Sequence, residues 1–161
     1  MELELYGLVP NFSWVIPGRL AGSGKPAREH AECEVEAYAA LYEVGIRGVL
    51  SLLHSPPPKA VIEDMGLISL HFPIADLGAP SQVEAYVEIL DVAHAHAEAG
   101  RPMLIHCYAG IGRAGMTLAA WLVRYEGYSP RDAIDHVREL RPGSIETRGQ
   151  AAFLASIRRE Q

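Results

Sequence analysis

The sequence has few of the features that direct a protein out of the cell or into a membrane. Its 161 residues include two cysteines, Cys33 and Cys107, which are too few for a disulfide framework. The longest strongly apolar run, residues 116–123, is far too short to cross a bilayer. The acidic start, residues 1–5, lacks the basic and apolar segments of a signal peptide. We therefore expect a soluble, cytoplasmic protein with no membrane partner.

Positive charge is also scarce. The chain has 14 basic and 20 acidic residues, which gives a formal net charge of −6. This balance argues against binding to nucleic acid and against a polybasic membrane anchor. An anionic substrate would have to be bound by a local positive site.

The rest of the composition is that of an ordinary globular protein, with 49% apolar and 21% charged residues. A chain of this length buries about two-thirds of its unfolded surface, so it needs no metal or disulfide to fold. The glycine- and proline-rich stretches are too short to be linkers between domains. We expect one domain over residues 1–161.

Strand and helix patterns alternate along the chain. Alternating strands and helices predict an α/β fold with a mainly parallel central sheet flanked by helices on both faces. The predicted strands are 12–16, 46–53, 67–72 and 103–106. The predicted helices are 29–44, 58–65, 81 up to the glycine at 100, 113–126 (a central helix), one from 130 and one after 147.

Three of the predicted helices begin with capping signals. Residues 81–84 read Ser-x-x-Glu and residues 147–150 read Thr-x-x-Gln, and both match a capping box. Residues 129–130 read Ser-Pro, a cap followed by proline at the first helical position. Residues 22–25, Gly-Ser-Gly-Lys, lack the spacing of a nucleotide-binding loop, and we predict a turn there.

Cys107 lies where an apolar strand is predicted to turn into an apolar helix. Backbone amides at a helix N-terminus can lower a thiol pKa from about 8.5 to roughly 3.5–7.5. Gly110 and Gly112 allow the loop to curl with its amides inward, and the planar fork of Arg113 suits two oxygens of a phosphate. The loop therefore predicts a nucleophile within an anion cradle. The alternative is a buried structural cysteine and a surface arginine.

The segment His106-Cys107-x-x-Gly110-x-x-Arg113 resembles the signature of cysteine-dependent protein tyrosine phosphatases. Residues 11–22 and 141–147 are similar to the opening and closing segments of small atypical dual-specificity phosphatases of the VHZ type. The resemblance implies a phosphatase-like fold, a phosphocysteine formed on Cys107, and no cofactor or metal. It also implies a substrate-binding loop made of His106, Tyr108, Ala109, Gly110, Ile111, Gly112 and Arg113.

A proton donor for the leaving group is expected from a second loop at the same sheet edge. Asp76 lies directly after the predicted strand at 67–72 and is our candidate, the alternative being a turn aspartate beside a helix start. The resemblance also suggests that Glu146 or Gln150 orients water. Arg19 either lines the mouth of the site or pairs with a surface carboxylate. Where the family has Ser or Thr after the arginine, this chain has Ala114.

The resemblance predicts a hydrolase for phosphotyrosine, and also for phosphoserine or phosphothreonine. The partner would be a phosphorylated protein or a small phosphomonoester, and we expect a monomer. A phosphatase of a lipid, sugar or RNA 5′-phosphate is an alternative, which the lack of lysine in residues 108–112 weakens. A rhodanese-like sulfurtransferase, which would not need Asp76, and a phosphate-binding pseudophosphatase with Ala114 are two further alternatives.

Overall fold

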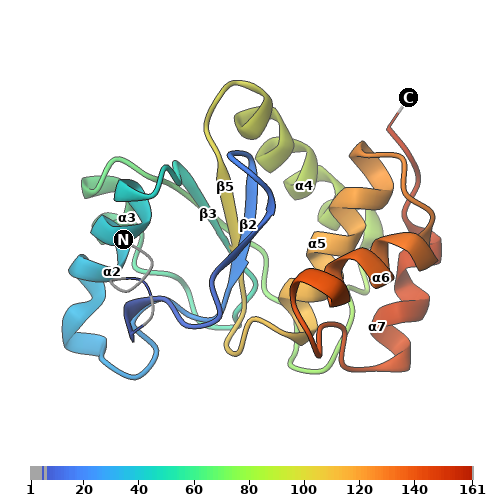
Figure 1. Ribbon diagram of the computed structural model, residues 1–161, viewed down its shortest axis with the longest axis horizontal. Helices are drawn as coiled ribbons and strands as arrows, with labels where there is room; N and C mark the ends of the chain where they lie inside the picture. Colours follow the sequence, from blue (N-terminus) through green and yellow to red (C-terminus); the bar gives the residue numbers. More distant parts are fainter. Residues whose placement is uncertain (1–4, 6, 161) are drawn as a thin grey trace.

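A five-stranded sheet runs through the middle of the molecule, as Figure 1 shows. The computed structural model describes Leu5 and residues 7–160, so the acidic residues 1–4 lie outside the described part. β1 is antiparallel to β2, and the other neighbouring strands are parallel, which confirms the predicted, mainly parallel sheet. The strand order is β1 (Ser13–Ile16), β2 (Leu20–Ser23), β5 (Met103–His106), β3 (Gly48–Ser51) and β4 (Ile68–His71).

Helices cover both faces of this sheet (Figure 1). On one face lie α2 (Glu34–Glu43), which follows a short 3-10 turn η1 (Ala31–Cys33), and α3 (Lys59–Asp64). None of the helices in the described residues is long and apolar enough to span a membrane. The other face carries α4 (Val83–Glu98), α5 (Gly112–Tyr125), α6 (Pro130–Leu140) and α7 (Arg148–Phe153), which continues into η2 (Leu154–Ser156).

Alternation along the strands divides the core into two parts. Leu50 and Ile105 pack into the cluster formed with α4, α5 and α6, whereas Val49 and Leu104 pack with α2 and α3. Residues 112–123 of α5 are all buried, as expected for a central helix. The cysteine loop joins β5 to α5, and the core therefore holds it at both ends.

The strand β2 is the main departure from the predicted elements. Residues 22–25 are not a simple turn, because Gly22 and Ser23 complete a strand that pairs with both β1 and β5. The sequence Leu-Ala-Gly-Ser lacks β-branched and aromatic residues, so its strand is imposed by tertiary pairing. Gly22 is required there, since a Cβ would lie 2.6 Å from the side chain of Leu118.

Smaller differences concern helix starts. The helix predicted from residue 29 begins at Glu34, after the 3-10 turn. The caps at Ser129 and Thr147 are confirmed, and the second is a complete capping box. The capping box predicted for residues 81–84 is wrong, because the N-cap is Gln82, whose side chain makes no capping hydrogen bond.

Candidate active site

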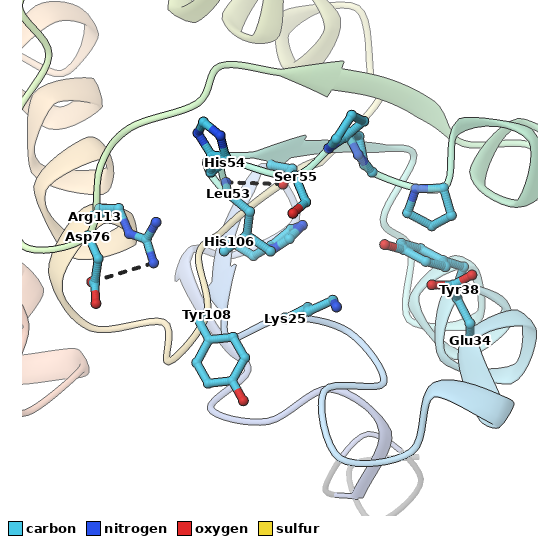
Figure 2. A pocket seen from close by; sticks show the side chains of 14 residues that line it. Lys25, Glu34, Tyr38, Leu53, His54, Ser55, Asp76, His106, Tyr108 and Arg113 are labelled. Atoms are coloured by element: carbon cyan, nitrogen blue, oxygen red, sulfur yellow. Dashed lines mark hydrogen bonds and ion pairs between the residues drawn. The ribbon is translucent and has the colours of Figure 1, made fainter.

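The predicted site residues meet at one edge of the sheet. β4 and β5 are parallel to β3, so the segments after them leave at the same edge and bring Asp76 and Cys107 together. Arg113 Nη2 lies 3.5 Å from Asp76 Oδ1, and Arg113 Nη1 donates to the Ile74 carbonyl at 3.0 Å (Figure 2). Cys107 is 2% exposed and Arg113 6%. Asp76 is on the surface and Arg113 is beneath it.

The backbone of the loop after Cys107 is turned so that its carbonyls face away from the loop interior. Each carbonyl from residue 108 to residue 111 accepts a hydrogen bond from another part of the fold. None of the four corresponding amides donates to a residue that the structure describes. An unpaired amide needs a partner, and an anion at the centre of the loop can supply one. The bonds to the four carbonyls come from Lys25 N and Arg28 to Tyr108, from Asn11 to Ala109, from Asn11 and Arg141 to Gly110, and from Ile145 N to Ile111.

Gly110 allows this loop geometry. Its φ is +78°, in the region that favours glycine. A Cβ at this position would lie 2.5 Å from the backbone nitrogen of Gly24. The loop therefore needs glycine both for its conformation and for its close contact with the end of β2.

Arg141 is a site residue that sequence reasoning missed. Its guanidinium is buried, and Nη2 donates to the Gly110 carbonyl at 2.5 Å while Nη1 donates to the Gly22 carbonyl at 3.0 Å. Nη1 also donates to the Asn11 carbonyl and to Ser13 Oγ. Burial lowers the pKa of Arg141 to about 10, and the attraction of Cys107 opposes that shift. The one signal in the sequence was its place in the segment 141–147.

The sulfur of Cys107 receives a backbone donor where the family has a hydroxyl. The amide of Ala114 lies 3.4 Å from Cys107 Sγ, and Ala114 is fully buried. This amide belongs to the first turn of α5, where the helix dipole is positive. The start of α5 therefore stabilises negative charge on the sulfur without a side-chain hydroxyl.

His106 lies beneath the loop. Its Nδ1 is 3.2 Å from the Cys107 carbonyl, so the ring contacts the backbone at the start of the loop. Burial lowers the pKa of His106 to about 4, so the ring is neutral near pH 7. Tyr108, next to Cys107 on the other side, is 53% exposed and lies at the mouth of the pocket.

Two of the three supporting residues lie at the site. Gln150 is fully buried, and its Oε1 accepts from the Glu146 amide at 2.9 Å. A Cβ on Gly112 would lie 3.2 Å from Gln150 Nε2 and would collide with Glu146 Oε1, so both side chains flank the end of the cysteine loop. Arg19 does not line the site, and the second of its two predicted roles, pairing with surface carboxylates, is confirmed. It precedes β2 at the opposite edge of the sheet and pairs there with Glu98 and Glu126.

A pocket of about 620 Å³ opens beside the cysteine loop (Figure 2). Asp76, Arg113, His106 and Tyr108 line the part beside the cysteine loop. No group of three or more His, Cys, Asp or Glu side chains in the described part of the chain is arranged to hold a metal ion. The arrangement brings together a thiol, a set of unpaired amides, a guanidinium and a carboxyl group. It can bind a tetrahedral oxyanion and transfer a proton beside it.

Comparison with known proteins agrees with this geometry. Human cyclin-dependent kinase inhibitor 3 is 37% identical over 115 residues, which cover 70% of this chain and 53% of that protein. The chain thus spans about half the length of the curated relatives it matches.

Two solved structures have the same fold over most of their length. Tk-PTP in its active form is 35% identical with a TM-score of 0.76, and the match covers 92% of this chain and 96% of that one. Kinase-associated phosphatase with its catalytic cysteine replaced by serine is 26% identical with a TM-score of 0.71, over 84% and 83% of the two chains. A sequence model of the Swiss Army Knife dual-specificity and protein tyrosine phosphatase domain matches residues 9–154. The chain therefore belongs to this family of cysteine-based phosphatase domains.

Proposed function

We propose that this domain hydrolyses phosphotyrosine in proteins, and phosphoserine and phosphothreonine as well, through a phosphocysteine on Cys107. The observation that carries the proposal is the hydrogen bonding of residues 108–111, next to the buried thiol of Cys107: their carbonyls all accept bonds from other parts of the fold, and their amides donate to none of the described residues. Arg113 at the start of α5 adds two donors in a fixed plane. Together they match the oxygens of a phosphoryl group.

In the first step, Cys107 Sγ attacks phosphorus and the bond from phosphorus to the leaving oxygen breaks. The electron pair goes to that oxygen, which takes a proton from the Asp76 carboxyl group. Arg113 and the loop amides bind the three remaining oxygens as charge develops on them. The distance of 3.5 Å between Arg113 Nη2 and Asp76 Oδ1 supports this role for Asp76.

In the second step, water attacks phosphorus and gives a proton to the Asp76 carboxylate. The bond from phosphorus to sulfur breaks, and the electron pair returns to Cys107. The Ala114 amide supports the sulfur as it leaves. Glu146 and Gln150 flank the cradle at Gly112 and would orient the water.

The test compares reactions that separate the candidate chemistries. The protein should release phosphate from p-nitrophenyl phosphate and from a phosphotyrosine peptide, and it should show no thiosulfate:cyanide sulfurtransferase activity. Cys107→Ser should lose turnover and still bind vanadate, because the amides and Arg113 remain. Turnover at the wild-type rate in that variant contradicts the mechanism. Activity confined to lipid, sugar or RNA phosphates would favour the non-protein alternative, and vanadate binding without turnover would favour a pseudophosphatase.

The proposal treats the chain as one catalytic domain that acts as a monomer in the cytoplasm. Support for the compartment comes from the two cysteines, Cys33 and Cys107, which are both free. A thiol nucleophile has to stay reduced, and the cytosol keeps thiols reduced. Size-exclusion chromatography with light scattering measures the mass in solution and so tests whether the protein is a monomer.

A further inference from the structure

The pocket above the cysteine loop extends well beyond the space that a phosphoryl group needs. Its volume is about 620 Å³, and it reaches from Asp76 and Arg113 at one end to Glu34 and Tyr38 at the other. Residues 54–58, His-Ser-Pro-Pro-Pro, form one wall. Figure 2 shows Lys25 entering this extension from the segment that follows β2. The extension has room for a side chain next to a bound phosphorylated residue.

Lys25 is fixed against the cysteine loop. Its backbone amide donates to the Tyr108 carbonyl at 2.9 Å, and the amide of the preceding Gly24 donates to the Pro10 carbonyl at 2.8 Å. Both bonds hold the Cα of Lys25 beside the loop while its side chain lines the pocket. The fold therefore fixes the point at which the Lys25 side chain enters the pocket.

The ammonium group of Lys25 has no carboxylate partner within 4.0 Å among the residues that the structure describes. The chain has two lysines, and the other, Lys59, is paired with Glu63 at 3.7 Å. Lys25 is partly buried, yet its charge is unpaired in a chain of net charge −6. The positive charge also acts inside the protein, since it adds to the effect of burial in lowering the pKa of His106.

The charges along the pocket divide it into two parts. Arg113 and Lys25 carry the fixed positive charges of its lining, and the neutral His106 belongs to the same lining. Arg113 faces Asp76 and the phosphate site, so it is not available to a second anion. Glu34 lines the pocket together with Tyr38 and disfavours an anion near it. The part beside Lys25 is thus the place for a second negative group.

We propose that Lys25 binds the carboxylate of an acidic residue that neighbours the phosphorylated residue, so that the domain prefers phosphopeptides with acidic flanks. The inference rests on the proposed phosphatase function and adds a specificity-determining residue to it. Residues 108–112 contain no lysine that could bind a second negative group of the substrate. Lys25 supplies such a cation from a segment distant in the sequence. An ion pair at a partly exposed site gives about a fivefold preference.

The test measures kcat/KM for two phosphotyrosine peptides that differ only in having Glu or Gln on both sides of the phosphotyrosine. The wild-type ratio, Glu peptide over Gln peptide, should be about five at low salt and should fall toward one as salt screens the pair. Lys25→Met should bring the ratio to about one, and Lys25→Glu should bring it below one. The matched control, Lys59→Met, removes the same charge outside the pocket and should keep the wild-type ratio.

The ratio cancels any general loss of activity in a variant. A ratio of one in the wild type, or a ratio that Lys25→Met leaves unchanged, would overturn the proposal while the phosphatase function stands. A protein that hydrolyses neither peptide would refute the proposed function instead. In that case fluorescence anisotropy measures the affinity of the wild-type protein for the same two peptides. Equal affinities for the Glu and Gln peptides would count against the role of Lys25.

Discussion

Arg141 Nη2 donates to the carbonyl of Gly110 at 2.5 Å, although 31 positions separate the two residues in the chain. The same guanidinium reaches the Gly22 carbonyl in β2. These bonds hold the Gly110 carbonyl away from the loop interior and keep the neighbouring amides directed inward. A buried cation behind the loop thus determines the geometry of the anion site in front of it.

Removing that cation should therefore damage binding and catalysis together. We expect Arg141→Met to lower kcat/KM for an aryl phosphate by about a hundredfold, because small displacements of binding groups have effects of this size. Unfolding in urea should show a loss of about 3 kcal/mol, since the carbonyls of Gly22 and Gly110 lose a buried donor.

Arg131 on α6 is exposed and provides a control. Arg131→Met should leave both measurements within error. If Arg141→Met kept the wild-type affinity for vanadate, the loop would hold its shape without Arg141, and the assigned role would be wrong.

Asp76→Asn should slow poor leaving groups far more than good ones, because only a basic leaving oxygen needs a proton. The measurement is kcat/KM across a series of aryl phosphates whose phenols differ in pKa. The slope of log kcat/KM against leaving-group pKa should be steeper in the variant. Equal losses across the series would mean that Asp76 only orders its loop, where Oδ1 accepts from the Leu77 amide at 3.0 Å.

The alanine after Arg113 should make the second step slow. Among the described residues, the Ala114 amide is the one donor to Cys107 Sγ, at 3.4 Å, and a hydroxyl would add about 1.5–3 kcal/mol. An activated aryl phosphate should give a burst of phenol near one equivalent, followed by slower turnover. Ala114→Ser should raise the steady rate by about tenfold or more and shrink the burst. A progress curve without a burst, and no gain in the variant, would show that the amide is sufficient.

His106 should make the fold sensitive to acid. Burial lowers the pKa of its ring from 6.5 to about 4, so between these values the unfolded chain binds a proton that the folded protein does not. The contribution of His106 to the free energy of unfolding is fully present above pH 6.5. It falls as the pH approaches 4, by about 3 kcal/mol in total.

Urea unfolding of wild type and His106→Asn from pH 4 to pH 7 isolates this contribution. The difference in unfolding free energy between the two proteins should narrow as the pH falls. A difference that is constant with pH would mean that folding leaves the pKa of the ring unchanged.

The sequence was most informative where the interactions are local. Thr147 and Gln150 are three residues apart and cap one helix, and residues 107–111 form one loop that joins β5 to Arg113 in the first turn of α5. The apolar character of most sides of the helix predicted at residues 113–126 indicated the buried helix α5 in the same way. Such features depend on neighbours in the chain, and a single sequence contains those neighbours.

The contacts that shape the loop could not be predicted in this way. Asn11 reaches the Ala109 carbonyl from 98 positions away, and Arg141 reaches the Asn11 carbonyl across 130. No periodic pattern links such pairs. The strand β2 was missed because its pairing with β1 and β5, and not its own residues, makes it a strand. The turn predicted for residues 22–25 included Lys25, and the residues around it in the sequence gave no sign that its side chain lines the pocket.

The long reach of Arg141 has a consequence for how the protein comes to be active in the cell. During synthesis the cysteine and its loop are made before residue 141. Until then the Gly110 and Gly22 carbonyls lack the Arg141 donor, and Gln150 cannot reach Gly112. A growing chain therefore has the thiol of Cys107 before it has the contacts that shape the loop, and we expect it to bind phosphate only when its last helices fold against the sheet.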